Sequence, residues 1–199
     1  MSKNWPVWFG AVIGFAAIGF AFATQAGTVD QWHNAAHYTA RVGFPLLMLA
    51  YIARPLVELT RNDWAKYLLA RRKYFGLGFA LAHTIHLGAL ITAIEVSGEG
   101  KGIVTYIFGG AAYAILYVMA FTSNTAAMKA MGIWWKRIHR FGIHYLWFIF
   151  FQSYAGRIAD PEQSVIAIPF TLVAIGAAGI RFLAWWKARQ RRAASANGA

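Results

Sequence analysis

The sequence contains no cysteine and few charged residues. Without cysteine, the chain cannot form disulfides, iron–sulfur clusters, thiolate nucleophiles or cysteine-ligated zinc sites. Charged residues make up 13% of the 199 residues, whereas about 25% is usual in globular domains. Hydrophobic residues make up 59%. This composition argues against an ordinary soluble domain and indicates an integral membrane protein.

Acidic residues are especially scarce: seven Asp and Glu stand against 19 Lys and Arg, for a formal net charge of +12. In a soluble protein this excess would suggest a nucleic-acid partner. Here the cations gather between apolar runs, so we attribute them to membrane topology and expect no nucleic-acid partner. The shortage of intramembrane carboxylates also argues against an ion-coupled transporter. No helix carries the two-His-plus-Glu pattern of a zinc hydrolase.

Six apolar runs have the composition of membrane-spanning helices, which rise about 1.5 Å per residue across a hydrocarbon core of about 30 Å. We therefore predict an all-α fold, an integral membrane six-helix bundle that forms a single transmembrane domain over 1–199. The predicted helices cover 7–23, 32–53, 76–94, 103–121, 139–154 and 164–186. The first run is expected to be a retained helix, because its N-terminal flank carries Lys3 alone and no convincing cleavage site follows.

The connections between these runs alternate in charge. The segments 54–73 and 122–140 and the tail after 186 are strongly basic, whereas the other connections are neutral or acidic. Cytoplasmic loops carry the excess of Lys and Arg in membrane proteins. The alternation therefore predicts a multi-pass protein in contact with membrane lipid, with both termini in the cytoplasm.

Histidine is the residue most able to carry chemistry in these runs, because a buried imidazole needs a partner and is a common metal ligand. His83 and His86 are three residues apart, which places them on one face of the third predicted helix. His37 lies in the second helix, and His139 and His144 open the fifth. Histidines on separate apolar helices are a way for helix bundles to hold haem. The structural alternatives are hydrogen bonds at helix ends and contacts with lipid headgroups.

The depths of these histidines along straight helices allow two pairings. His83 and His144 lie at similar depths, and His86 lies nearer to the level of His37. A helix tilt of about 20° blurs the levels by several ångströms, so both pairings stay open.

Three segments resemble the ferric-reductase-like transmembrane family. They are HYTAR at 37–41, the Arg pair that precedes a helix with TIHL, and SNTAAMKAMGIWWKRIHR at 123–140. More narrowly, the sequence is similar to the haem-binding membrane subunits of periplasmic methionine-sulfoxide reductase systems, over most of 34–147. The resemblance implies a b-type cytochrome of the bacterial inner membrane that relays electrons from a flavin or quinol donor to a periplasmic acceptor. Such a chain is an electron-transfer subunit rather than a complete enzyme, with FMN or a quinone as the electron donor.

The resemblance further implies that His86 and His139 are haem ligands. The family has another histidine thirteen residues after the second of these, where this sequence has Gln152. A glutamine amide is a poor haem ligand. Three alternatives follow: His83 and His144 replace the missing ligand at a shifted level, the chain binds one haem b rather than two, or haem is lost.

Three arginines are candidate partners for the haem propionates, because guanidinium pairs well with carboxylate: Arg41, Arg72 and Arg140. The alternative is that they anchor lipid headgroups. The rival to an electron relay is a non-catalytic structural or assembly subunit descended from such a cytochrome, which would pack within a larger membrane complex through aromatic and small-residue faces.

Overall fold

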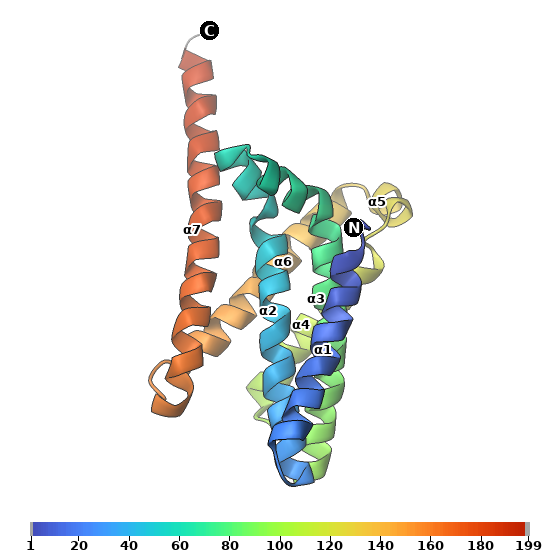
Figure 1. Ribbon diagram of the computed structural model, residues 1–199. Helices are drawn as coiled ribbons and strands as arrows, with labels where there is room; N and C mark the ends of the chain where they lie inside the picture. Colours follow the sequence, from blue (N-terminus) through green and yellow to red (C-terminus); the bar gives the residue numbers. More distant parts are fainter. Residues whose placement is uncertain (1, 198–199) are drawn as a thin grey trace.

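The computed structural model describes residues 2–197, and this part of the chain is built from seven helices (Figure 1). They are α1 (Trp5–Thr24), α2 (Thr28–Thr60), α3 (Asp63–Ser97), α4 (Ile103–Phe121), α5 (Thr125–Met131), α6 (Ile133–Ala155) and α7 (Pro161–Asn197). Five of these, α1, α2, α3, α4 and α7, are long and apolar enough to cross a membrane. The all-α fold is confirmed, and the apolar helices fit a membrane bundle.

The helix α6 is too polar at its start to count among those five. Its first two turns carry Lys136, Arg137 and Arg140, so the apolar part that follows is short of the roughly 20 residues that a perpendicular span needs. In Figure 1 this helix runs obliquely across the bundle from α5 to the start of α7. The predicted start at position 139 lies within α6, which begins at Ile133.

The segment 54–73 was expected to be a loop, and this expectation is wrong. α2 continues to Thr60 and α3 begins at Asp63. Arg61 ends α2 in the left-handed region, at φ 54°. The side chain of Asn62 then caps α3 by accepting a hydrogen bond of 2.8 Å from the Ala65 N–H. A C-cap followed directly by an N-cap reduces the connection to a tight turn.

The helices divide into two packing groups. α1, α2 and α3 pack against one another, whereas α4 packs on α3 and α6, and α7 packs on α2 and α6. The start of α1, the α2–α3 turn, α5 and the C-terminal part of α7 lie toward one end of the molecule (Figure 1). The basic segments of the sequence therefore gather at that end.

The closest helix crossing in the first group joins α1 to α3. Gly10 and Gly78 meet there backbone to backbone: a Cβ atom on Gly10 would overlap the Gly78 carbonyl, and one on Gly78 would overlap the Pro6 carbonyl. Small residues allow this approach, which favours helix association in membranes.

Replacing Gly10 with leucine should destabilise this crossing, because the new side chain meets a backbone rather than a movable side chain. We expect Gly10→Leu to lower the free energy of unfolding by about 3 kcal/mol. Gly19→Leu is the matched control, since nothing lies within 4 Å of a Cβ at that position of the same helix. Thermal unfolding in detergent, followed by circular dichroism, compares the two. Equal melting temperatures would refute the tight crossing.

Candidate functional site

The two α3 histidines share one face of the helix, as their spacing predicts. Their ring centroids lie 5.3 Å apart. Both rings meet α2: His83 lies against Gly43, where a Cβ atom would come within 2.6 Å of the His83 Nδ1. His86 Nδ1 lies 3.1 Å from the hydroxyl of Thr39. Thr39 and Gly43, four residues apart on one face of α2, thus contact His86 and His83, respectively.

The hydrogen bonds of Thr39 fix the tautomer of His86. The Thr39 hydroxyl donates to the Ala35 carbonyl at 2.6 Å, so its only proton is already used. His86 must therefore carry its proton on Nδ1 and donate it to Thr39 Oγ1. This leaves the lone pair on Nε2. A histidine that binds a metal through one nitrogen commonly donates the other N–H to a neighbouring acceptor in this way.

His83 is buried and incompletely paired. It is 8% exposed, and among the described residues its Nδ1 has no hydrogen-bond partner. The hydroxyl of Tyr113, on α4, is buried without a partner as well, and its ring centroid lies 6.3 Å from that of His83. Buried polar atoms are nearly always paired in proteins. Both atoms are therefore exceptions to this rule, and the His83 Nδ1 faces α2 at Gly43.

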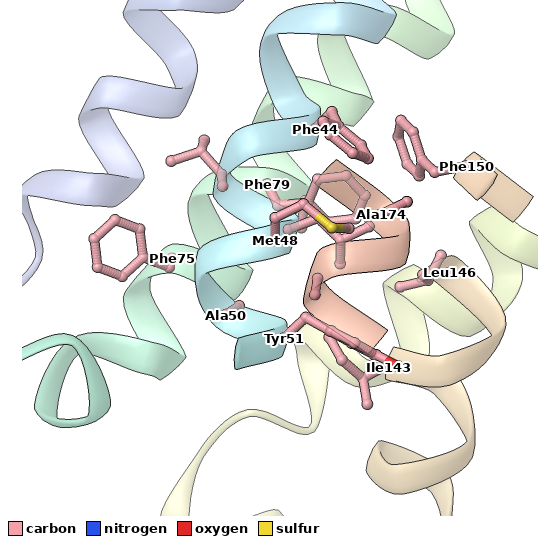
Figure 2. Close-up of a cluster of buried hydrophobic side chains, with 14 of the residues drawn as sticks. Phe44, Met48, Ala50, Tyr51, Phe75, Phe79, Ile143, Leu146, Phe150 and Ala174 are labelled. Atoms are coloured by element: carbon pink, nitrogen blue, oxygen red, sulfur yellow. The ribbon is translucent and has the colours of Figure 1, made fainter. Parts of the chain in front are cut away.

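Aromatic rings fill the space beside His83. The ring of Phe79 lies 4.3 Å from it and the ring of Phe150, on α6, lies 5.1 Å from it, measured between centroids. Figure 2 shows Phe44, Phe79 and Phe150 converging from α2, α3 and α6. The centre of the bundle is thus lined by flat apolar rings.

Both ring nitrogens of His139 lie close to backbone carbonyls, and a neutral ring donates its single N–H to one of them. Its Nδ1 lies 3.0 Å from the Trp135 carbonyl and its Nε2 lies 3.2 Å from the Met119 carbonyl on α4. The Trp135 ring stacks on it at 4.0 Å. His139 therefore ties the start of α6 to the end of α4, and neither nitrogen is presented to a cofactor.

His144 is likewise engaged by the protein. Its Nδ1 lies 3.1 Å from the Tyr51 hydroxyl, and its Nε2 lies 3.2 Å from Nη2 of Arg181, on α7. A guanidinium can only donate, so Nε2 is the acceptor and the proton sits on Nδ1. The lone pair that could bind a metal is directed at Arg181.

Arg181 is a residue that sequence reasoning missed, and Pro55 explains its place. Proline has no N–H, so the carbonyl four residues earlier in α2, that of Tyr51, is left without a helical partner. Arg181 Nη1 donates to this carbonyl at 2.7 Å, and its guanidinium lies 4.3 Å from the centroid of the Tyr51 ring. Two features of the sequence could have indicated this contact: Arg181 is a single arginine in one apolar run, and Pro55 lies next to another.

His83 and His144, one of the two pairs that the sequence allowed, lie at different depths in the structure. His83 contacts Gly43, whereas His144 contacts Tyr51. Eight residues of α2 separate these contacts, which is about 12 Å along the helix. The oblique course of α6 shifts its histidine toward the basic end of the molecule.

His37 and His86 lie at similar levels on different faces of α2. His86 reaches Thr39 on the side that meets α3. His37 lies seven residues, or about two turns, before Phe44 and therefore on the same face of α2. The Phe44 ring contacts α6 and α7. The nearest aromatic contact of His37 is His33, at 4.5 Å between ring centroids. Of the five predicted ligands, the structure brings only the α3 pair together.

The predicted propionate partners lie apart from one another. Arg41 lies 5.6 Å from the centroid of the Tyr38 ring and lines a groove of about 380 Å³ between α1 and α2. Arg72 Nε donates to the Ala50 carbonyl at 2.9 Å, and Arg140 is exposed near the start of α6. Gln152 is exposed too, on the α6 side opposite the buried Phe150.

This arrangement defines an α-helical membrane-type bundle whose interior histidines are concentrated on one helix. The chain is similar to MsrQ of Klebsiella pneumoniae, the haem-binding subunit of protein-methionine-sulfoxide reductase. The two are 27% identical over 180 residues, covering 81% of this chain and 82% of that protein. No family model matches the chain, and no solved structure matches it. The similarity supports a distant relationship to this haem-binding subunit.

The α3 side of the site has the donor chemistry for haem, and the α6 side does not. Among the described residues the His86 Nε2, which carries the lone pair, has no hydrogen-bond partner, and His83 brings a second imidazole. Within residues 2–197, no three His, Asp or Glu side chains gather to hold a bare metal ion. The site therefore suits a cofactor that takes one or two imidazoles. Phe79 and Phe150 would have to turn aside to admit it.

Enlarging Gly43 should disturb His83, because the added methyl group would overlap its ring. We expect Gly43→Ala to lower the free energy of unfolding by about 1–3 kcal/mol. Gly76→Ala is the control, since nothing lies within 4 Å of a Cβ there, and it should raise stability by up to about 1 kcal/mol. In a His83→Ala background the cost of Gly43→Ala should shrink. A cost that is unchanged in that background would contradict the contact.

Proposed function

We propose that this protein is a membrane b-type cytochrome whose haem is ligated from α3, and that it relays electrons across the bacterial inner membrane. The observation that carries the proposal is His86, whose Nδ1 is held by Thr39 and whose Nε2 is free. The neighbouring His83 and the distant similarity to a haem-binding subunit support it. Haem bound there supplies the one-electron chemistry of its iron.

In this proposal the chain's own residues ligate the haem, orient the ligand ring and shield the site from water. Thr39 keeps the His86 ring in one orientation and raises its basicity through the Nδ1–H hydrogen bond. Gly43 lets the His83 ring lie against α2. The aromatic rings around the site exclude water, and a dry surrounding is one of the factors that set a reduction potential.

The proposal places the basic end of the molecule in the cytoplasm. The excess of Lys and Arg at that end supports this orientation, which puts both termini inside and the six long helices across the membrane. A flavin or quinol is the proposed donor and a periplasmic protein the acceptor. The name of the relative, which describes a reductase subunit, supports the need for a separate partner.

A second candidate is a non-catalytic subunit that has lost haem. Three observations favour it: both ring nitrogens of His139 and of His144 are engaged by protein groups, Gln152 is exposed, and Phe150 packs beside His83. In this candidate function the aromatic centre is simply a packed core, and the chain supports a larger membrane complex.

An absorption spectrum of the purified protein, expressed with sufficient haem, distinguishes the two candidates. The cytochrome proposal predicts a Soret band and a sharp α-band on dithionite reduction. His86→Ala should abolish most bound haem, and His83→Ala should reduce it or change its spectrum. His139→Ala and His144→Ala should keep the haem while lowering thermal stability, because their rings hold α6 in place.

The control is His33→Ala, which should leave the spectrum and the melting temperature unchanged because His33 is an exposed residue near the start of α2. A colourless wild-type preparation would support the structural subunit. Haem that survives both α3 substitutions would refute ligation from that helix.

The role of Thr39 can be tested separately through the reduction potential. Thr39→Val keeps the shape of the side chain and removes the acceptor for the His86 N–H. We expect haem binding to weaken on the order of 10–100-fold, with a more positive midpoint potential because a less basic imidazole stabilises ferric iron less. Thr39→Ser keeps the hydroxyl and should stay near wild type in a spectroscopic redox titration. A valine variant with unchanged affinity and potential would argue against this hydrogen bond.

A further inference from the structure

An open groove of about 400 Å³ runs along the outside of the bundle between α4 and α6. Its walls are apolar, and Arg137 contributes the methylene groups of its side chain rather than its guanidinium. Ile115 and Val118 line it from α4, and Ile138 and Phe141 line it from α6. A ligand for this groove therefore needs an apolar body.

The Arg137 guanidinium lies outside this apolar lining, and no carboxylate pairs with it among residues 2–197. The Arg137 guanidinium lies 5.0 Å from the centroid of the Trp134 ring, which also lines the groove. No Asp or Glu occurs from position 100 to 159. The two ion pairs found within residues 2–197, Arg54–Glu58 and Lys66–Asp63, lie in other segments. The apolar body should therefore carry an anionic group.

The position of the groove fits the membrane boundary. Its lining residues come from the C-terminal half of α4 and the first turns of α6, which flank α5. This is the end of the molecule at which the basic segments gather (Figure 1). The N-terminal part of α4, at the other end of the helix, exposes Ile103, Val104 and Ile107, as expected of a helix that faces lipid tails.

We infer that this groove binds an anionic phospholipid, with an acyl chain along the α4–α6 wall and its phosphate on Arg137. A free phosphate would satisfy the guanidinium and leave the apolar walls uncovered. A second copy of the chain would bring its own basic segment against the first. The inference rests on the membrane placement in the proposed function and is independent of haem.

Native mass spectrometry of the full chain, released from detergent micelles with added lipid, tests this inference. Phosphatidylglycerol and phosphatidylethanolamine with identical acyl chains are the probes. The wild type should retain phosphatidylglycerol preferentially. Arg137→Gln should weaken that retention about fivefold, as expected for one cation at a membrane surface. Arg140→Gln removes the same charge three residues away, outside the groove lining, and should change retention little.

Further measurements complete the test. Val118→Trp should reduce lipid retention by filling the groove, and thermal unfolding must show that this variant and Arg137→Gln remain folded. Inorganic phosphate at millimolar concentration should not displace phosphatidylglycerol; displacement would identify a soluble-anion site and overturn the inference. Equal losses in Arg137→Gln and Arg140→Gln, or equal retention of both lipids, would overturn it as well. The haem spectrum should be unaffected by Arg137→Gln. A colourless wild-type protein that still binds the lipid would contradict the cytochrome proposal and leave this inference standing.

Discussion

The need to pair every polar group in an apolar interior is the constraint on which this structure depends. A buried imidazole or guanidinium without a partner is costly there. His139, His144 and Arg181 meet the constraint within the protein, through carbonyls and through one another. His86 meets it with one nitrogen, and His83 leaves a buried nitrogen unpaired. The histidines therefore fall into two groups: His139 and His144 bond to other helices, whereas His83 and His86 each keep a ring nitrogen without a protein partner among the described residues.

The same constraint connects the backbone to the architecture. Pro55 removes a helical hydrogen bond from α2, and the freed carbonyl of Tyr51 becomes an acceptor that faces α7. Arg181 uses it and reaches on to His144 of α6. One proline therefore fixes contacts among three helices that are distant in sequence. His144 is engaged in this network, so its Nε2 lone pair is directed at Arg181 and not at a ligand.

Periodicity and charge were sufficient to predict the apolar helices and the shared face of His83 and His86, because both follow from local spacing. The tight turn at Arg61 and Asn62 escaped prediction because two caps join helices where the composition suggested a loop. The histidine levels on α6 depend on its oblique course, which is a property of packing. Thr39, Gly43 and Tyr113 carry no distinctive pattern in the sequence, and they become site residues only because α2 and α4 lie against α3.

The energetic balance at the bundle centre bears on the choice between a cofactor and a purely structural core. Each aromatic pair there contributes about 0.5–1.5 kcal/mol beyond the burial of its area. A porphyrin, which is itself flat and apolar, would replace ring contacts such as that of Phe79 with Phe150 by contacts of the same kind. An unpaired buried polar group costs about 1–3 kcal/mol, and among the described residues His83 and Tyr113, whose ring centroids lie 6.3 Å apart, each carry one. A structural subunit would gain stability by replacing these groups with apolar ones, and their presence is one argument for the proposed cofactor.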